Sequence, residues 1–246
     1  MKIIRHLIYY ASYYGLLLLA ILRYVWFLPF LKPYTVGWLF SKNARTLMWI
    51  IEKTLGLSYR VKGKENIPQD RRVIIVSKHQ SGWEAAALPA ILPPHVFIVK
   101  RELIFIPLAG LVCMATNQIW IDRKKSNANK LLQEQVKERF GYGLSLCIFP
   151  EGTRTKPGDH HTVYKTGAAH LAQQLKIDLL PVALNTGEFF SKGFFKEPGV
   201  ATFSICPPIS WDAAETPREL MQLVKETIEA EQKAIEGAGP LFSSKK

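Results

Sequence analysis

The chain has 246 residues, of which 48% are hydrophobic and 21% are charged. This balance excludes a disordered or low-complexity protein, and the length suits one sizeable α/β domain, alone or with a small appendage. Lys and Arg outnumber Asp and Glu by 32 to 20, and the net charge of +12 favours a polyanionic partner. Three scattered cysteines in apolar runs favour buried thiols in a reducing compartment over disulfides or a metal site; they are Cys113, Cys147 and Cys206.

The N-terminal segment is typical of a membrane-attached protein. Residues 7–31, "LIYYASYYGLLLLAILRYVWFLPFL", are apolar and aromatic except for Arg23, and no small-residue cleavage site of a signal peptide follows them. The run before Arg23 is slightly shorter than the about 20 apolar residues of a spanning helix, so a bilayer span and a helix lying in one leaflet both stay open. Residues 36–56 predict a second, amphipathic helix with basic and aromatic residues, which suits either an anionic bilayer surface or a protein core.

From residue 57 onward the pattern alternates between strands and helices. Strands are predicted at 57–63, 72–78, 96–100, 118–123, 143–149, 178–187 and 200–206, and helices at 83–92, 108–115, 126–140, 164–175 and 216–237. Thr216 and Glu219 form a capping box at the start of the last helix. The alternation predicts an α/β fold with a mixed, largely parallel sheet covered by helices. We expect residues 1–56 to form N-terminal membrane-associated helices, a membrane-binding helical hairpin, and residues 57–246 to form the α/β domain.

Three polar clusters lie at or directly after the ends of predicted strands: "KHQSGWE", "DR" and "PEGTRT". Ligand sites in α/β sheets collect where strands end, so we expect these clusters to meet in one crevice. The loop "DHH" at 159–161 has no accompanying set of metal ligands and is predicted to be a solvated loop.

His79 and Glu84 raise two interpretations. On a continuous helix five positions amount to about 500°, so the two side chains would point apart; they can meet only if the chain bends at Ser81 and Gly82. Glu84 would then orient the ring of His79 and leave the other ring nitrogen free to accept a proton. Alternatively "SGWE" is a capping box, in which Glu84 satisfies the start of a helix, and both interpretations can hold together.

The sequence lacks an obvious covalent nucleophile. It contains no G-x-S-x-G elbow, no cysteine in a polar setting and no Gly-rich phosphate loop. A base at His79 would therefore deprotonate a hydroxyl group of the substrate. Arg123 and Arg154 each follow a predicted strand or its terminal turn, where an arginine suits bidentate binding of phosphate.

Taken in order, the blocks "HQSGWE", "KRELIFIPLAGLVCMATNQIWIDR", "FPEGTRT" and "LLPVALNTG" resemble the four motifs of the glycerolipid acyltransferases, most closely the bacterial 1-acylglycerol-3-phosphate acyltransferases. The resemblance covers about residues 70–190 and implies that His79 is the catalytic base and Glu84 its partner. The first block of this family commonly ends in aspartate, whereas this chain has the longer Glu84. The resemblance also implies residues that bind the acceptor: Lys100, Arg123, Glu151, Gly152, Thr153, Arg154 and Lys165. Asn185 would be structural or would line the acceptor site.

The function implied is transfer of a fatty acyl group from a thioester, acyl-CoA or acyl carrier protein, to the sn-2 hydroxyl of lysophosphatidic acid. The product would be phosphatidic acid, made at the cytoplasmic face of a bacterial inner membrane among anionic lipids, without a metal or other cofactor. Another lysolipid acceptor, such as an ornithine lipid precursor, stays open. A non-catalytic basic protein that binds anionic lipid is the alternative, and it leaves the motif blocks unexplained. No nucleic-acid-binding module is recognised, so nucleic acid is not expected as a partner.

Overall fold

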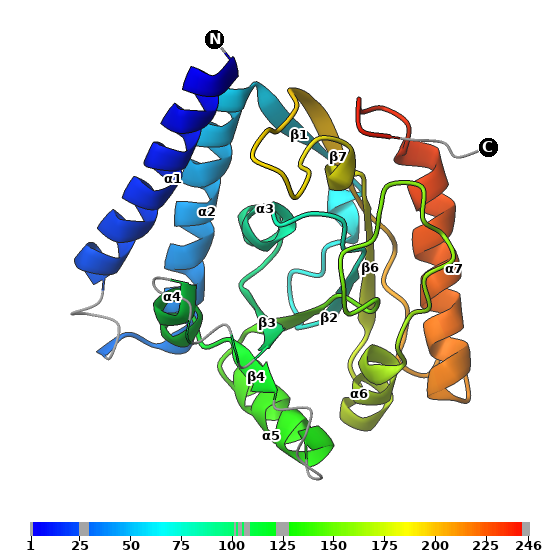
Figure 1. Ribbon diagram of the computed structural model, residues 1–246. Coiled ribbons are helices and arrows are strands. Elements are labelled where there is room, and N and C mark those ends of the chain that lie inside the picture. The colour runs from blue at the N-terminus through cyan, green and yellow to red at the C-terminus, as the bar shows by residue number, and fades with distance from the viewer. Residues whose placement is uncertain are drawn as a thin grey trace.

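The computed structural model describes residues 2–24, 30–100, 102, 105, 109–121 and 128–242, and it forms a seven-stranded sheet with helices on both faces (Figure 1). The strand order is β1-β7-β6-β2-β5-β3-β4. All neighbouring strands are parallel except β6 and β7. The predicted mixed, largely parallel sheet is thereby confirmed. The strands are β1 (Leu57–Lys62), β2 (Ile74–Ser77), β3 (His95–Lys100), β4 (Ile119–Ile121), β5 (Ser145–Ile148), β6 (Leu179–Leu184) and β7 (Gly199–Ile205).

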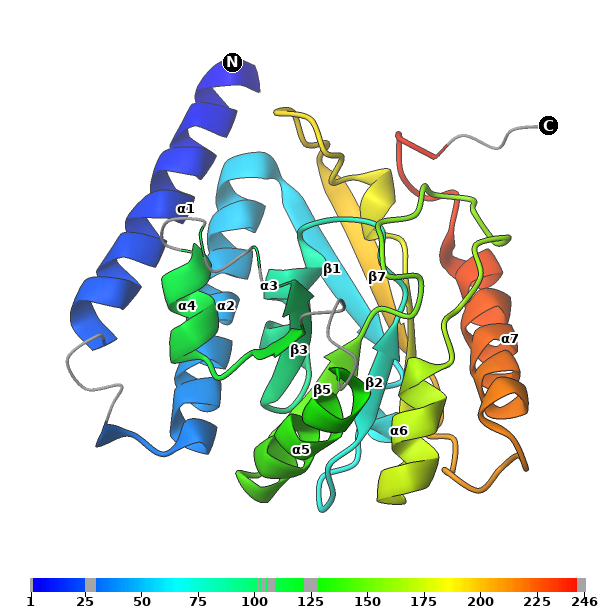
Figure 2. The same ribbon diagram turned by 60° about the horizontal axis from the view of Figure 1, so that its bottom comes forward.

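The helices form two layers, one on each face of the sheet. They are α1 (Lys2–Tyr24), α2 (Pro33–Leu55), α3 (Glu84–Ile91), α4 (Ala109–Ala115), α5 (Ala128–Gly141), α6 (Gly167–Leu175) and α7 (Pro217–Ile235), with short 3-10 turns η2 (Lys64–Asn66) and η4 (Thr186–Glu188). Figures 1 and 2 show α1 and α2 together at one side of the sheet and α7 at the other. The predicted capping box at Thr216 and Glu219 is present at the start of α7.

The central strand β2 divides the core because its side chains alternate between the two faces. Ile75 packs in the core cluster that α2 and α3 cover. Ile74 and Val76 pack in the opposite cluster, which α5, α6 and α7 cover. This alternation continues past the end of the strand, and it determines which way the next residues point.

The N-terminal helices pack side by side, and they differ in burial. Helix α2 presents Leu47, Met48 and Ile51 to the core beside α3, as a core helix does. Helix α1 leaves its apolar residues outside, and only 11% of the apolar window in Lys2–Leu22 is buried. Among the described residues, α1 is the helix that is long and apolar enough to cross a membrane. The predicted boundary at residue 56 falls at Gly56, between α2 and β1.

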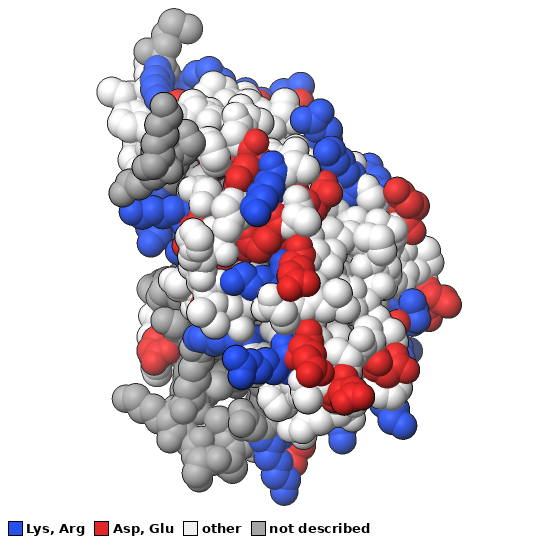
Figure 3. All heavy atoms as spheres, turned by 90° about the vertical axis from the view of Figure 1, so that its right-hand side faces the viewer, with Lys and Arg blue, Asp and Glu red and all other residues white. Residues whose placement is uncertain are grey.

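The positive net charge is not gathered on the side of the molecule that carries α7. Figure 3 shows acidic and basic side chains interspersed there. Such a face has no continuous positive field that would attract a polyanion.

Candidate active site

The candidate site lies at the carboxyl end of the central strands β2, β5 and β6. His79 follows β2, Glu151 follows β5 and Thr186 follows β6. The backbone N–H of His79 donates to Glu151 Oε1 at 3.3 Å, and the N–H of Thr155 donates to the carbonyl oxygen of His79 at 2.7 Å. The polar clusters after β2 and β5 therefore meet, as the topology of a parallel sheet requires. The cluster after β4, which contains Arg123, lies outside the described residues.

His79 and Glu84 form a hydrogen-bonded pair. His79 Nδ1 lies 2.5 Å from Glu84 Oε2. The Glu84 side chain is fully buried, whereas 18% of the His79 side chain is exposed. A carboxylate can only accept, so Nδ1 carries the proton and Nε2 presents a lone pair. Nε2 makes no hydrogen bond to any described residue, and the pair therefore has the geometry of a base with its orienting carboxylate.

The other oxygen of Glu84 caps the turn between β2 and α3. Glu84 Oε1 accepts from the N–H groups of Gln80 and Ser81 at 2.9 and 2.6 Å, and from the hydroxyls of Ser81 and Thr186. The chain bends at Ser81 and Gly82 before α3 begins, which brings Glu84 back to His79. Both interpretations of the motif thus hold, because one carboxylate oxygen caps the turn and the other holds the ring. The start of α3 also favours the negative charge.

Aromatic side chains support the ring of His79. The ring of Phe149 stacks on it with a centroid distance of 4.0 Å and an interplanar angle of 16°. Phe97 stacks in turn on Phe149 at 5.8 Å. This stack fixes the plane of the imidazole and shields one of its faces from water.

Glu151 lies beneath His79, away from solvent. Glu151 is only 4% exposed. Its Oε1 accepts the backbone N–H of His79, and its Oε2 is buried without a partner among the described residues. Burial raises the pKa of Glu151 to about 7, against the lowering effect of two backbone N–H groups and Lys78. The geometry therefore directs this carboxylate to the backbone of His79, where it supports the base.

Two predicted cations lie against glycines near the site, Arg154 at the turn between β2 and α3 and Lys165 at the loop after β5. A Cβ atom on Gly82 would lie 3.3 Å from Arg154 Nη2, and one on Gly152 would lie 2.8 Å from Lys165 Nζ. Gly152 has φ +69°, so the close approach of Lys165 and the left-handed backbone both favour glycine there. Thr153 is exposed in the same loop. Lys100 ends β3, and its side chain lies outside the described residues, as does the whole of Arg123.

Asn185 is a structural residue. Its side chain is fully buried, Oδ1 accepts the N–H of Thr202 at 2.7 Å, and Nδ2 donates to the carbonyl oxygen of Ile235 at 2.9 Å. It thus joins β6 to β7 and α7. The next residue, Thr186, reaches Glu84 and was missed by sequence reasoning, although it lies within the block "LLPVALNTG".

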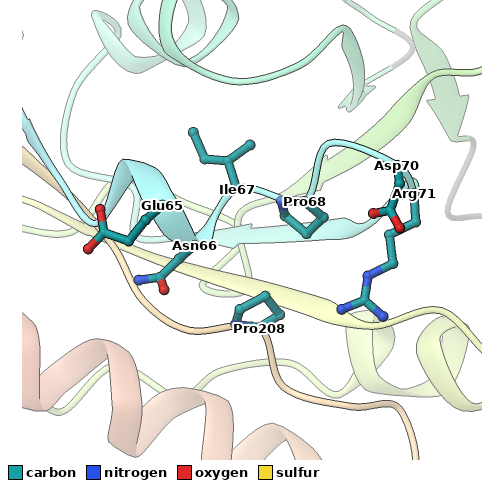
Figure 4. A pocket seen from close by; sticks show the side chains of 7 residues that line it. All are labelled: Glu65, Asn66, Ile67, Pro68, Asp70, Arg71 and Pro208. Atoms are coloured by element: carbon teal, nitrogen blue, oxygen red, sulfur yellow. The ribbon is translucent and has the colours of Figure 1, made fainter.

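A separate pocket of about 310 Å³ lies at the opposite end of the strands, beside the amino end of β2 (Figure 4). Strands β1 and β7 run opposite to β2, so the loop after β1 lies far from the carboxyl end of β2. Arg71 at this pocket pairs with Asp178 at 2.7 Å. The pocket is not part of the site around His79; it is lined by Glu65, Asn66, Ile67, Pro68, Asp70, Arg71 and Pro208.

Comparison with known proteins finds a family model and several proteins whose sequences are similar to this chain. The family model described as Acyltransferase matches residues 58–185. The 1-acyl-sn-glycerol-3-phosphate acyltransferase of Pseudomonas aeruginosa is 33% identical over 216 residues, which cover 84% of this chain and 83% of that protein. The 1-acyl-sn-glycerol-3-phosphate acyltransferase alpha of Mus musculus is 32% identical over 69% of this chain, and the match spans 61% of the mouse protein.

The fold is also seen in a solved structure. It is the crystal structure of the 1-acyl-sn-glycerophosphate acyltransferase PlsC from Thermotoga maritima, which aligns with a TM-score of 0.71 over 95% of this chain and 97% of that chain. The sequence identity of this pair is 24%. The likeness therefore concerns the arrangement of the sheet and helices.

Proposed function

The chain belongs to the acyltransferase family, and we propose that it transfers a fatty acyl group from a thioester to the sn-2 hydroxyl of 1-acylglycerol 3-phosphate. The product is phosphatidic acid, made for phospholipid biosynthesis. The observation that carries the proposal is the His79–Glu84 pair, in which the backbone carbonyl of His79 is hydrogen-bonded to Thr155 of the loop that bears Arg154 and Lys165. The acyl donor is acyl-CoA or an acyl carrier protein.

His79 acts as the general base in this reaction. Its Nε2 removes the proton of the acceptor hydroxyl while the oxygen attacks the thioester carbonyl. Buried Glu84 stabilises the imidazolium that forms. The tetrahedral intermediate then collapses, the carbon–sulfur bond breaks, and the thiolate takes the proton from His79. Positioned base catalysis of this kind supplies about 10²- to 10⁴-fold in rate, and the transfer uses no metal or other cofactor.

The acceptor's phosphate binds at two cations of the loop after β5, Arg154 and Lys165. Arg154 offers a planar guanidinium that can bind two phosphate oxygens, and Lys165 adds a second positive charge. Lys100, Arg123, Gly152 and Thr153 join them, as the family motifs imply, and the left-handed backbone of Gly152 shapes the loop. The resemblance also implies Glu151 as a phosphate ligand, but its side chain is buried and accepts the backbone N–H of His79, so we assign it the task of supporting the base.

The N-terminal helices attach the enzyme to anionic lipid at the cytoplasmic face of a bacterial inner membrane. Exposed apolar residues cover α1, and on α2 the Nζ of Lys42 lies 3.8 Å from the ring centroid of Trp38, a pairing that suits the lipid headgroup region. A lipid acceptor with one acyl chain can then reach His79 from the bilayer. The exposed residues of α1 are Ile3, Ile4, Leu7, Ile8, Tyr14, Leu18, Leu19 and Leu22.

The function is tested with the purified full-length protein, a panel of lysolipids and both classes of thioester donor. Transfer to lysophosphatidic acid with at least one donor is the expected result. Transfer to a different lysolipid alone would contradict the acceptor assignment. Salt-sensitive binding to anionic vesicles without transfer to any lysolipid would favour the non-catalytic alternative.

Replacing Arg154 with alanine is expected to raise the KM for lysophosphatidic acid by about tenfold or more, because a charge-assisted hydrogen bond contributes about 1.5–3 kcal/mol. The KM for the thioester should change little, since the proposed partner of the guanidinium is the acceptor's phosphate. Steady-state kinetics with each substrate varied in turn measure both values. Equal increases in the two KM values would argue against a phosphate-binding guanidinium. Lys156→Ala in the same loop serves as the matched control.

Replacing both Ile8 and Leu19 with glutamate is expected to weaken binding to phosphatidylglycerol vesicles by about tenfold or more. The reason is that a charged residue costs about 2.5–3.5 kcal/mol inside a bilayer. Both side chains are exposed on α1, so folding should be preserved. Vesicle sedimentation measures the bound fraction. Val163→Glu, at a residue that is 76% exposed in the loop after β5, is the control for added negative charge. Unchanged binding of the double variant would show that α1 does not enter lipid.

A further inference from the structure

Lys78, next to the base, is buried in an ion pair. The residue is 1% exposed, and its Nζ lies 2.6 Å from Glu229 Oε1 of α7. It also donates to the carbonyl oxygen of Asp159 at 2.8 Å. Because side chains alternate along an extended segment, Lys78 points to the α7 face while His79 points to the face that α2 and α3 cover. An ammonium group removed from water needs such partners.

The partners of Lys78 belong to a larger polar network. Glu229 Oε1 also accepts the hydroxyl of Tyr164 at 2.8 Å, and Glu229 Oε2 lies 2.6 Å from His160 Nδ1. The other nitrogen of His160 lies 2.9 Å from Glu236 Oε1. Burial raises the pKa of Glu229, but the hydrogen bonds of Lys78, His160 and Tyr164 and the charge of Lys78 together leave that pKa below its usual value. The prediction of a solvated loop at 159–161 is therefore wrong for His160, because α7 supplies carboxylates that lie some 70 residues away in the sequence.

The segment held by this network is the one that carries the candidate phosphate ligands. The side chain of Asp159 fixes its own turn by accepting from the N–H groups of His161 and Thr162. Upstream, Thr155 donates to the carbonyl oxygen of His79 through both its N–H and its hydroxyl. Residues 151–165 are thus attached to the base at one point and, through Lys78, to α7 at another.

We propose that Lys78, Glu229 and His160 are positioning residues, which hold the loop 151–165 so that its cations lie at the correct distance from His79 Nε2. None of the three touches a reacting atom; they act through Arg154 and Lys165. The inference rests on the proposed function, since it assigns a task to the acceptor site. It also gives the C-terminal helix α7 a part in acceptor binding, although α7 lies on the opposite face of the sheet from α3 (Figure 1).

The test removes both charges of the ion pair. Lys78→Met alone would leave Glu229 buried without its cation, whereas the double variant K78M/E229Q leaves no unpaired charge and keeps an acceptor for Tyr164. We expect the KM for lysophosphatidic acid to rise and kcat/KM to fall by about 10- to 100-fold, because a small displacement of a positioning group has effects of about this size. The KM for the thioester should stay within about twofold. Amide hydrogen exchange at residues 156–164 should be faster in the variant, with no substrate present.

E226Q/K233M is the matched control, since it changes the same residue types at exposed positions of α7. It should leave kinetics and exchange at wild-type values. A wild-type KM for the acceptor in K78M/E229Q, or equal increases in both KM values, overturns the proposal even if exchange becomes faster. Absence of transfer to lysophosphatidic acid by the wild-type enzyme would instead refute the proposed function. In that case unchanged exchange at 156–164 in the double variant still overturns the positioning network.

Discussion

Replacing His79 with alanine is expected to lower kcat for acyl transfer by about 10²- to 10⁴-fold, the usual contribution of a positioned base. The reason is that Nε2 of His79 carries the lone pair that removes the acceptor's proton, and no other described side chain near Glu84 can take over. Ser81 and Thr186, the neighbouring hydroxyls, are engaged with Glu84 and with each other. The measurement is the initial rate at saturating concentrations of both substrates.

The variant should fold, which makes the loss of activity interpretable. Glu84 keeps the donors of Gln80, Ser81 and Thr186 when the imidazole is removed, so its charge stays hydrogen-bonded. His161→Ala, at an exposed histidine, is the control and should have wild-type kcat. Near-normal turnover by His79→Ala, with a wild-type thermal transition, would exclude His79 as the base.

The fold was largely predictable because local patterns in the sequence indicate its strands and helices. Apolar β-branched runs such as 72–78 and the amphipathic helices between them have distinct periods, and every predicted strand and helix from residue 57 to 237 has its counterpart among the described elements. The two-residue bend at Ser81 and Gly82 likewise predicted that His79 and Glu84 could meet, and they do. Short-range signals of this kind need no knowledge of tertiary structure.

The parts of the site that were not predictable depend on strand order. Thr186 and Glu84 are 102 residues apart in the sequence, and Lys78 and Glu229 are 151 residues apart. The local spacing of residues therefore cannot predict either contact. Which strands become neighbours decides both contacts. The same reason explains the error at His160, whose carboxylate partners come from the last helix. Whether 1–56 and 57–246 act as separate units stays a prediction, although α2 contributes side chains to the core.

The replacement of Glu84 by glutamine is expected to lower kcat by about 10²- to 10⁴-fold although only one atom changes. Glu84 Oε1 accepts from the N–H groups of Gln80 and Ser81 and from the hydroxyl of Thr186, and these donors need an acceptor. The amide oxygen of the glutamine must therefore occupy this position. Its NH₂ group then faces His79 Nδ1 and donates to it, which places the ring proton on Nε2. The atom that should remove the acceptor's proton is then already protonated.

The thermal stability of two Glu84 variants separates the effect on the tautomer of His79 from the effect on the hydrogen bonds of the turn. Glu84→Gln should unfold close to the wild-type temperature, because its amide oxygen retains the hydrogen bonds of the turn. Glu84→Ala leaves those buried donors without an acceptor, at a cost of about 1–3 kcal/mol each, so its melting temperature should fall clearly. Differential scanning calorimetry and saturating kcat on the two variants distinguish the two tasks of the carboxylate. An active Glu84→Gln enzyme would mean that the Nδ1–H tautomer of His79 is not the catalytic one, because the amide cannot accept a proton from Nδ1 while it satisfies the turn.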